Sequence, residues 1–476
     1  MKSSATLRVM AVATLLTAVS GCDEGLTEIN RNPNSPDQAT AEQLFPNGVE
    51  ASVSRVFGSG LHMDLTALWA QQYSEFLYTD EDIFRISDGS ISGNWGSFYA
   101  GPLQDFQEVI EKGVETERPN VAAIGTIMQT WTFHVMTDLW GDIGYSEALQ
   151  GRDPDASSTP ALDSQEQVYT GMFAALTGAQ ATLAGGGSSF TPASADLIYG
   201  GDVEAWQRFA NSLRLRMAMR ISDVDAATGN AEFNAALAAG VFESNADNAV
   251  LGYHDDEVSV HPLYSYQQSR DDHGISATMV DTLKALSDPR LAVYANPTAR
   301  NGSYQGAPNG SEFDPPIDSI SRIGSYFTRA DAEAVLMSYA EVLFLQAEAA
   351  ERGWITADAA SLYTDAITAS MEQFGIAQAE IDAYLAQPRV AYNGLPSIGV
   401  QKWIALYGNG PEAYAEWRRT GYPNLVAGPD ALNDGLIPVR LPYPQSEADR
   451  NGENLAEAVA RQGGAGLNDP LWWDVN

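Results

Sequence analysis

The sequence contains a single cysteine, Cys22, and few lysines. One cysteine allows no intramolecular disulfide and no cysteine-based metal site. Only four of the 26 basic residues are lysine, whereas 62 residues are acidic, and the formal net charge is −36. So acidic a surface argues against nucleic acid and against anionic lipid headgroups as partners. The composition also fits a chain from a salt-adapted or GC-rich source, so it does not by itself indicate a cationic ligand.

Motifs typical of enzymes are also missing. The chain has no GxSxG, no HExxH, no CxxC and no phosphate-cradling glycine-rich loop followed by lysine. With 62 acidic residues, some pair of carboxylates always lies at a distance suitable for glycoside hydrolysis, but no particular pair stands out. We therefore expect no catalytic residues, no enzyme activity and no cofactor.

The histidines give a weak indication of a metal site. His254, His261 and His273 fall within one 20-residue loop that is rich in aspartate. Imidazole and carboxylate groups together bind transition metals, but this spacing matches no known ligand motif. His134 lies in an apolar segment and is expected to be a core histidine. We expect no bound metal.

The start of the chain has the pattern of a lipoprotein signal. The apolar run Val9–Val19 is too short to span a bilayer as a helix. It ends in Val19–Cys22, which resembles the bacterial lipobox, so residues 1–21 are expected to be a signal peptide and Cys22 to carry the lipid. An ordinary signal peptide with a chance cysteine is the alternative. No later apolar run approaches the roughly 20 residues of a transmembrane helix, so lipid alone would anchor the protein to the membrane.

A helical hairpin is predicted over Ser338–Phe374. Apolar residues at helical spacing form one stripe, and Glu348 and Arg352 lie four residues apart on the opposite face as an ion pair. Gly353 is expected to end the first helix, because glycine adopts a positive φ at little cost, and Thr356 is expected to cap the second. Two helices, a tight turn and small alanines at the crossing are typical of a tetratricopeptide-like hairpin.

Helical periodicity recurs along most of the chain. Further helices are predicted at Ala41–Val56, Leu61–Leu77, Phe98–Val114, Val121–Leu139, Ser164–Leu183, Val203–Ile221, Ala231–Ala239, Ala379–Leu385, Ile398–Tyr407 and Ala413–Arg418. Loops are predicted at Thr79–Gly96 and Gly141–Pro160, loops with small β-hairpins at Asn248–Ala334, and a mostly irregular tail from Gly421. The sequence thus predicts a mainly α fold, with an extended arm at 22–40 and a single helical domain at 41–476.

Aromatic residues in polar, turn-rich segments are the candidate ligand-binding residues. Trp95, Tyr264, Tyr266 and Tyr326 have such surroundings. Sugar rings and peptide side chains stack on flat aromatic faces, while nearby Asn, Asp and Arg side chains fix their orientation. The alternative for each of these residues is that it holds its loop against the helical body.

Segments in a characteristic order resemble the SusD/RagB family of outer-membrane nutrient-binding lipoproteins of Bacteroidota. They are the lipobox, INRNPN at Ile29–Asn34, WGSFYAGPLQDF at Trp95–Phe106, YGGDVEAWQRFANSLRLRMAMRI at Tyr199–Ile221, DPRL at Asp288–Leu291, VLFLQAEAAERGW at Val342–Trp354, QKWIALYGNGPEAYAEWRRTGYP at Gln401–Pro423, RLPYPQSEADRN at Arg440–Asn451 and LWWD at Leu471–Asp474. The resemblance, closest to the SusD-like branch, implies a scaffold of tetratricopeptide-like hairpins with irregular loops and small β-hairpins on the ligand-facing side.

The same resemblance implies a function. Such proteins sit on the outer membrane, face the cell exterior, and act as a lid over a SusC-like TonB-dependent β-barrel. They capture an oligosaccharide or a peptide and deliver it to the barrel, and they are binders rather than catalysts. The adjacent Arg418 and Arg419 match a family motif and are expected to be structural, satisfied by carboxylates or helix carbonyls. The alternatives are a helical adaptor that binds a protein and no small ligand, and a surface glycan hydrolase.

Overall fold

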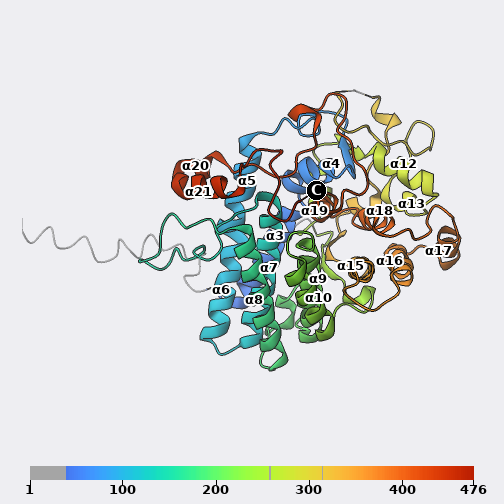
Figure 1. Cartoon of the computed structure of the whole chain (residues 1–476). Helices are drawn as coiled ribbons and strands as arrows, with labels where there is room; N and C mark the ends of the chain where they lie inside the picture. Colours follow the sequence, from blue (N-terminus) through green and yellow to red (C-terminus); the bar gives the residue numbers. More distant parts are fainter. Residues whose placement is uncertain (1–38, 257–258, 313–314, 476) are drawn as a thin grey trace, which may run out of the picture. The chain divides into compact units, whose positions relative to one another are not determined.

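Helices dominate the computed structural model, which describes residues 39–256, 259–312 and 315–475 (Figure 1). Cys22, the expected signal peptide and nearly all of the expected arm lie outside the described residues. Among the residues that are described, no helix has the length and apolar character needed to cross a membrane. The mainly α fold predicted from the sequence is confirmed.

The first part of the chain forms an array of antiparallel helices. Its helical segments are α3 (Ala41–Val56), the π-helix η1 (Ser59–Thr66), α4 (Ala67–Trp69), α5 (Asp88–Phe98), the π-helix η2 (Tyr99–Leu103), α6 (Gln104–Glu115), α7 (Pro119–Trp140), α8 (Gln165–Ala184), the 3₁₀-helix η3 (Ala193–Ala195), α9 (Val203–Arg220) and α10 (Ala226–Ala239). From α6 to α10 each helix contacts the next, and α6, α7 and α8 stand side by side in Figure 1. Pro119 and the Ser164 capping box begin α7 and α8 close to the predicted positions.

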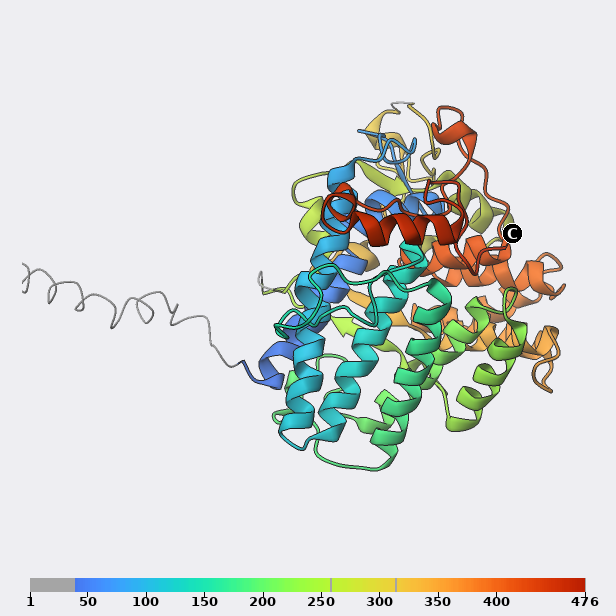
Figure 2. The same cartoon turned by 60° about the vertical axis from the view of Figure 1, so that its left-hand side comes forward.

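The second part mixes short helices with loops before helical hairpins return. Its helical segments are η4 (Asn245–Asp247), α11 (Pro262–Gln267), α12 (Ala277–Leu286), α13 (Leu291–Tyr294), η5 (Ile317–Ser319), α14 (Ser325–Thr328), α15 (Tyr339–Glu351), α16 (Ala359–Gln373), α17 (Gln378–Leu385), α18 (Leu395–Ala405), α19 (Gly410–Thr420), η6 (Asn433–Gly435), α20 (Gln445–Arg450) and α21 (Gly452–Gln462). In Figure 2, α20 and α21 (red) cross the view above the upright helices α6, α7 and α8.

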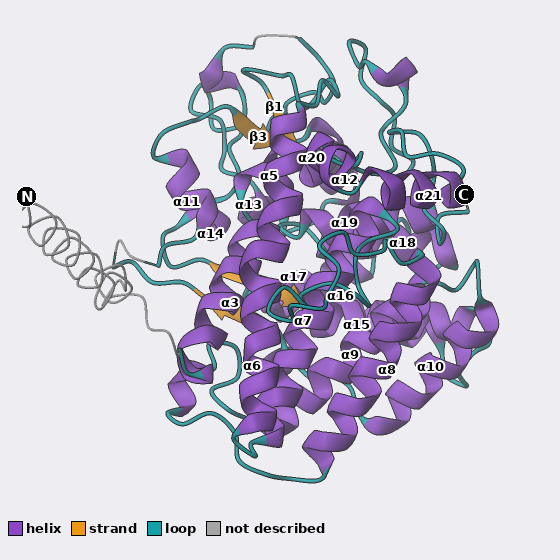
Figure 3. Ribbon diagram, turned by 90° about the vertical axis from the view of Figure 1, so that its left-hand side faces the viewer, coloured by secondary structure: helices purple, strands orange, loops and turns teal. Residues whose placement is uncertain are grey.

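Four short strands form two antiparallel pairs. The strands are β1 (Tyr73–Glu75), β2 (Ala249–Gly252), β3 (His273–Ile275) and β4 (Glu333–Met337). β1 pairs with β3, and β2 pairs with β4. Each partner is distant in sequence, so these pairs join remote segments instead of forming the local hairpins expected within Asn248–Ala334. Figure 3 shows β1 and β3 among the loops at one end of the molecule, with α8 and α10 toward the other.

The α15–α16 hairpin matches its prediction except at one cap. Gly353 comes two residues after Glu351, the last residue of α15, and has a φ of +73°. Glu348 and Arg352 form the expected ion pair at 2.8 Å. The cap of α16 is Asp358, whose side chain accepts a hydrogen bond from the Ala360 amide, and not Thr356. Asp and Thr both favour the N-cap position, so the sequence alone was compatible with a helix start at either Thr356 or Asp358.

Both faces of α15 are buried, because the face opposite the apolar stripe carries carboxylates that meet arginines of other helices. Arg216 of α9 donates two hydrogen bonds to Glu341, each of 2.7 Å. Arg419 of α19 lies between Glu348 and Glu416 and is paired with both. Arg418 donates to the backbone carbonyls of neighbouring segments. These arginines are therefore structural, as expected, and they attach the hairpin to the rest of the helical body.

The segment Asn248–Ala334 contains the short helices α11 to α14 as well as loops, and three further segments differ from their predictions. The segment Leu61–Leu77 contains η1, α4 and β1 instead of one helix, and α5 forms inside the segment Thr79–Gly96 that was predicted as a loop. The N-cap of α5 is Ser87, whose hydroxyl accepts a hydrogen bond from the Ser90 amide. The glycines of α5 lower its intrinsic helix propensity, so tertiary packing of Trp95 decides the outcome. The tail also contains more helix than expected, since α20 and α21 lie within it.

A buried histidine predicts a pH-dependent stability. His62 in η1 accepts a hydrogen bond at Nδ1 from the Gly410 amide (3.0 Å), and burial, followed by the charges of His261 and His273, lowers its pKa from 6.5 to about 3. The unfolded chain binds a proton below pH 6.5 and the folded chain does not, so this residue's contribution to stability falls as the pH drops from 6.5 toward 3. Between pH 7 and pH 5 the loss is about 2 kcal/mol.

Urea unfolding of the wild type and the His62→Asn variant at both pH values measures this effect. The difference in the free energy of unfolding between the wild type and the variant should be about 2 kcal/mol smaller at pH 5 than at pH 7, because asparagine does not titrate. An equal difference at both pH values would mean that His62 is not neutral in the folded protein.

Candidate ligand-binding site

An exposed aromatic surface lies at the end of the molecule that carries β1 and β3. Tyr78 is 75% exposed, an unusual value for a large aromatic side chain. The guanidinium of Arg270 lies 5.2 Å from the ring centre of Tyr78 and 5.8 Å from that of Tyr266. We call these three residues the Tyr78–Tyr266 face. Two flat rings joined by a planar cation form a surface on which a ring-shaped ligand can stack.

The pairing of β1 with β3 brings the parts of this face together. Tyr78 follows β1 by three residues, and Arg270 precedes β3 by three. Because Glu75 and His273 are directly opposite each other in the antiparallel register, the chain beyond each of them emerges at the same edge. Tyr266 comes from α11, which begins at a proline and is positioned just before β3. Residues almost 200 positions apart thus form one surface.

Hydrogen bonds to Asp272 fix the orientation of the face. The Tyr266 hydroxyl donates to Asp272 Oδ1 (2.9 Å), and Arg270 Nε donates to Asp272 Oδ2 (2.7 Å). Burial raises the pKa of Asp272, but hydrogen bonds and charge from His273, Tyr266 and Arg270 outweigh it and hold the pKa well below its ordinary value. Asp272 therefore stays ionised at neutral pH and holds both side chains in place.

A cavity of about 460 Å³ lies next to the face. Its lining is Ser54, Arg55, Gly58, Ser59, Gly60, Asn94, Pro262, Ser265 and Tyr266. Tyr266 thus belongs both to the exposed face and to the cavity wall. Asn94 is held there by a hydrogen bond from its side-chain amide to the Gly60 carbonyl (2.9 Å). The mixture of one aromatic ring with hydroxyl, amide and guanidinium groups suits a polar ligand with apolar ring faces.

Trp95 lies in a different place. It is only 4% exposed and packs edge-on against Trp140, with ring centres 5.4 Å apart, and against Tyr443 at 5.7 Å. Its remaining edge, together with Tyr99, lines a second cavity of about 470 Å³ bounded by the loop after α7 and by α20. Helix α5 separates the two cavities, since Asn94 lines the first and Trp95 the second.

The other two predicted residues are half-buried. Tyr264 lies on α11 two residues from Tyr266, and side chains two apart on a helix point in different directions, so Tyr264 does not share the surface of Tyr266. Tyr326 lies on α14, which contacts α11, and packs against Phe374 with ring centres 5.3 Å apart, while Arg329 stacks over its ring at 4.7 Å. Tyr326 thus holds α14 against the helical body in addition to lying near α11.

Sequence reasoning missed Tyr78 and Arg270. Tyr78 falls directly after a segment predicted as helix, so its exposure was not expected. The signal that could have indicated it is Asp80-Glu81-Asp82, which follows Tyr78 in the sequence and is typical of a polar loop. Arg270 precedes two aspartates in the histidine-containing loop. Their proximity follows from the β1–β3 register, which the local sequence does not reveal.

The structure separates the three histidines of the predicted loop. His254 is exposed, and His261 is buried as the cap of α11, where its Nδ1 accepts a hydrogen bond from the Leu263 amide. His273 lies beside two carboxylates from other segments, Asp64 and Glu75. The three histidines therefore form no common site, and among the residues that the structure describes only His273 has a set of possible co-ligands.

Comparisons with known proteins agree with this architecture. A SusD-like family model described as "Starch-binding associating with outer membrane" matches residues 33–444. No curated protein sequence matches the chain. A solved structure of a chitin-binding protein is 31% identical with a TM-score of 0.82, and the match covers 92% of this chain and 100% of that one.

Two further solved structures are similar. A chitin-binding SusD homologue from Flavobacterium johnsoniae is 28% identical with a TM-score of 0.81, covering 91% of this chain and 99% of that one. A SusD homologue from Bacteroides uniformis is 25% identical with a TM-score of 0.82, covering 92% and 100%. The family resemblance predicted from the sequence is confirmed, and the chain belongs to the SusD-like family.

Proposed function

We propose that this protein binds a glycan of the chitin type, a β-linked oligosaccharide of N-acetylglucosamine, through the Tyr78–Tyr266 face. The observation that carries the proposal is the exposed ring of Tyr78 and the half-buried ring of Tyr266 with Arg270 between them. The chitin-binding descriptions of two relatives, 31% and 28% identical, favour this glycan over a peptide. The proposed role is binding without catalysis, in accord with the lack of enzyme motifs.

The chemistry of the face fits such a sugar. The C–H groups on one side of a pyranose ring are apolar and stack on tyrosine rings, and the hydroxyl and acetamido groups at its edge need donors and acceptors. Arg270 offers donors, and its side chain is 48% exposed. Asp271, whose side chain is 60% exposed, offers acceptors and is held by Arg322 at 2.7 Å.

The sequence also supports a role in uptake. Lipid on Cys22 would anchor the protein to the outer membrane on the cell exterior, and a SusC-like TonB-dependent β-barrel would receive the glycan. In this role the protein acts as a lid that closes when ligand contacts both proteins, which requires the ligand to bind the closed state more tightly. Ligand binding by Trp95, in the cavity that it lines, stays a prediction. Ligand binding by Tyr326 also stays a prediction.

Calorimetry with a ligand panel tests the binding role. We expect chito-oligosaccharides to bind and to remain uncleaved during prolonged incubation. Starch-derived oligosaccharides and short peptides should bind at least tenfold more weakly. Binding of peptides in preference to every glycan would contradict the proposed ligand, and release of shorter sugars would favour the hydrolase alternative.

Isolation of the protein from its own host tests the uptake role. A C-terminal tag, gentle solubilisation of the outer membrane and mass spectrometry should recover a large TonB-dependent barrel in near-equal amount. Absence of any barrel, with lipid confirmed on Cys22, would favour the adaptor alternative.

A further inference from the structure

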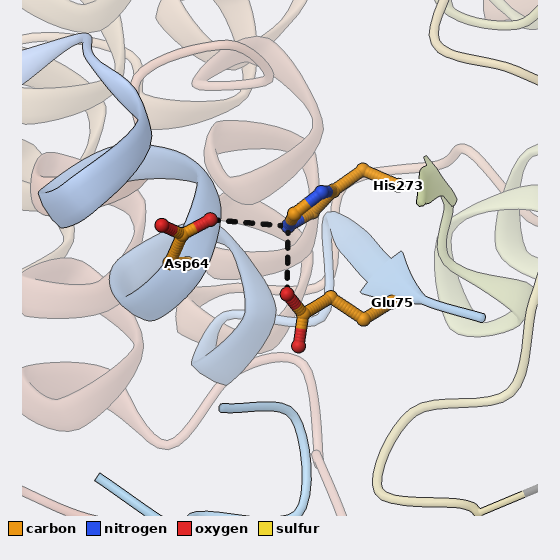
Figure 4. Close-up of side chains that lie close together, drawn as sticks. All are labelled: Asp64, Glu75 and His273. Carbon is orange, nitrogen blue, oxygen red and sulfur yellow. Dashed lines mark ion pairs between the residues drawn. The ribbon is translucent and has the colours of Figure 1, made fainter. Parts of the chain in front are cut away.

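Three side chains that could bind a metal converge below the Tyr78–Tyr266 face. Asp64 from η1, Glu75 from β1 and His273 from β3 place one ligand atom each within 4.8 Å of one another. His273 Nε2 lies 3.4 Å from Asp64 Oδ1 and 3.3 Å from Glu75 Oε1. Figure 4 shows both carboxylates pointing at this single ring nitrogen from different elements.

The imidazole nitrogen at the centre of the cluster lacks a hydrogen bond. The His273 side chain is 1% exposed, and its Nε2 has no hydrogen-bond partner among the residues that the structure describes. The distances of 3.3 and 3.4 Å are longer than an ordinary N–H···O hydrogen bond, which spans about 2.7–3.2 Å. A buried polar atom in this condition is costly, so its orientation toward two carboxylates needs an explanation.

The spacing is that of ligands around one small cation. Oxygen and nitrogen ligands at about 2.0–2.1 Å from a tetrahedral metal lie about 3.3 Å from each other. The two distances from His273 Nε2 match this value. The third distance, between the ligand oxygens of Asp64 and Glu75, can adjust on metal binding, because the Asp64 side chain is 29% exposed and lies at the solvent side of the cluster.

The surrounding structure holds the ligand atoms in place. Glu75 and His273 are a directly opposed pair of the β1–β3 register, so their side chains leave the same face of the strands. The Asp82 amide donates to Glu75 Oε2 (3.3 Å), which leaves Oε1 directed at the histidine. Asp272 Oδ1 lies 3.4 Å from His273 Nδ1, the position in which a carboxylate orients a metal-binding imidazole.

We propose that Asp64, Glu75 and His273 bind one divalent transition-metal cation, such as Zn²⁺, with water completing its coordination on the Asp64 side. One imidazole and two carboxylates suit this class of ion, whereas Ca²⁺ prefers six to eight oxygen ligands. The cation would tie η1 to the strands that carry the Tyr78–Tyr266 face. This site does not depend on the proposed glycan function.

The charges of the cluster favour a cation. The Asp64 and Glu75 carboxylates each place an oxygen within 4.8 Å of the other and of the same ring nitrogen, and the Glu75 side chain is 3% exposed. A divalent cation supplies the positive charge that two such carboxylates need where little water reaches them.

Cobalt and zinc titrations of the chelator-treated, full mature protein test the site. We expect one Co²⁺ per chain with the visible absorption of a four- or five-coordinate ion, displacement by Zn²⁺, and a Tm that rises with zinc concentration. Asp64→Asn should weaken zinc binding at least about tenfold, and His273→Gln should abolish the cobalt spectrum. Asp64 is partly exposed, so its variant remains informative even if His273→Gln fails to fold.

His254→Gln is the matched control, because His254 is an exposed histidine next to aspartates and lies outside the cluster. It should bind zinc as the wild type does. Failure of the folded, chelator-treated wild type to bind a stoichiometric ion would overturn the site, and so would equal zinc affinity in the wild type and the Asp64→Asn variant.

Discussion

Replacing Arg419 by methionine should lower the free energy of unfolding by about 3–5 kcal/mol, the usual effect of removing one partner from a buried ion pair. Arg419 is buried and donates to both Glu348 (2.7 Å) and Glu416 (2.5 Å). Burial alone would raise the pKa of Glu348 and Glu416, but the charge of Arg419, foremost among their cationic neighbours, lowers both. Without that arginine two buried carboxylates lose their main counter-charge. Urea unfolding at pH 7 measures the loss.

Two further variants separate charge from packing. Arg352→Met removes a more exposed partner of the same Glu348, with an N–O distance of 2.8 Å, and should cost about 1 kcal/mol or less. The double variant Arg419→Met/Glu348→Gln should recover part of the lost stability, because the second substitution removes the buried Glu348 charge that the first leaves without its main counter-charge. If Arg419→Met were no more destabilising than Arg352→Met, the buried ion pairs would not hold the α15–α16 hairpin to α19.

Replacing Tyr78 by alanine should weaken binding of a chito-oligosaccharide about tenfold or more, equivalent to about 1.4 kcal/mol or more. The side chain is 75% exposed, and its ring packs against the Arg270 guanidinium at the protein surface. Its loss therefore removes stacking area from the ligand with little effect on the fold. Calorimetry gives the affinity, and thermal unfolding verifies that Tm is nearly unchanged.

Tyr78→Phe is the matched variant, because it keeps the ring and removes only the hydroxyl. It should bind within about threefold of the wild type if stacking dominates. Tyr392→Ala is a remote control, since this partly exposed tyrosine lies between α17 and α18. An affinity unchanged by Tyr78→Ala would place the ligand elsewhere on the molecule.

Much of the fold could be predicted from periodicity and caps. The α15–α16 hairpin, its ending glycine and helices such as α7 to α9 follow from local patterns that tertiary packing reinforces. The burial of Glu341 and Glu348 could not be predicted, because a helical pattern shows where apolar residues lie and not whether an arginine from another helix will meet a carboxylate. Helix α5, rich in glycine, was missed for the related reason that its packing outweighs its propensity.

The candidate site was predicted only in part. Tyr266 was identified from composition and belongs to the Tyr78–Tyr266 face, and Tyr264, identified in the same way, lies on the same helix α11. Tyr78 and the Glu75–His273 pair depend on a strand register that joins segments almost 200 residues apart. A three-residue strand carries too little alternation to specify its partner, so no local signal brings these residues together.

A crystal structure of the protein with a chito-oligosaccharide tests the central claim most directly. We predict sugar density stacked on the Tyr78 and Tyr266 rings, with Arg270 or Asp271 in contact with the edge groups of a sugar ring. Ordered sugar confined to the Trp95 cavity, with the Tyr78–Tyr266 face empty, would contradict the assignment of the binding surface.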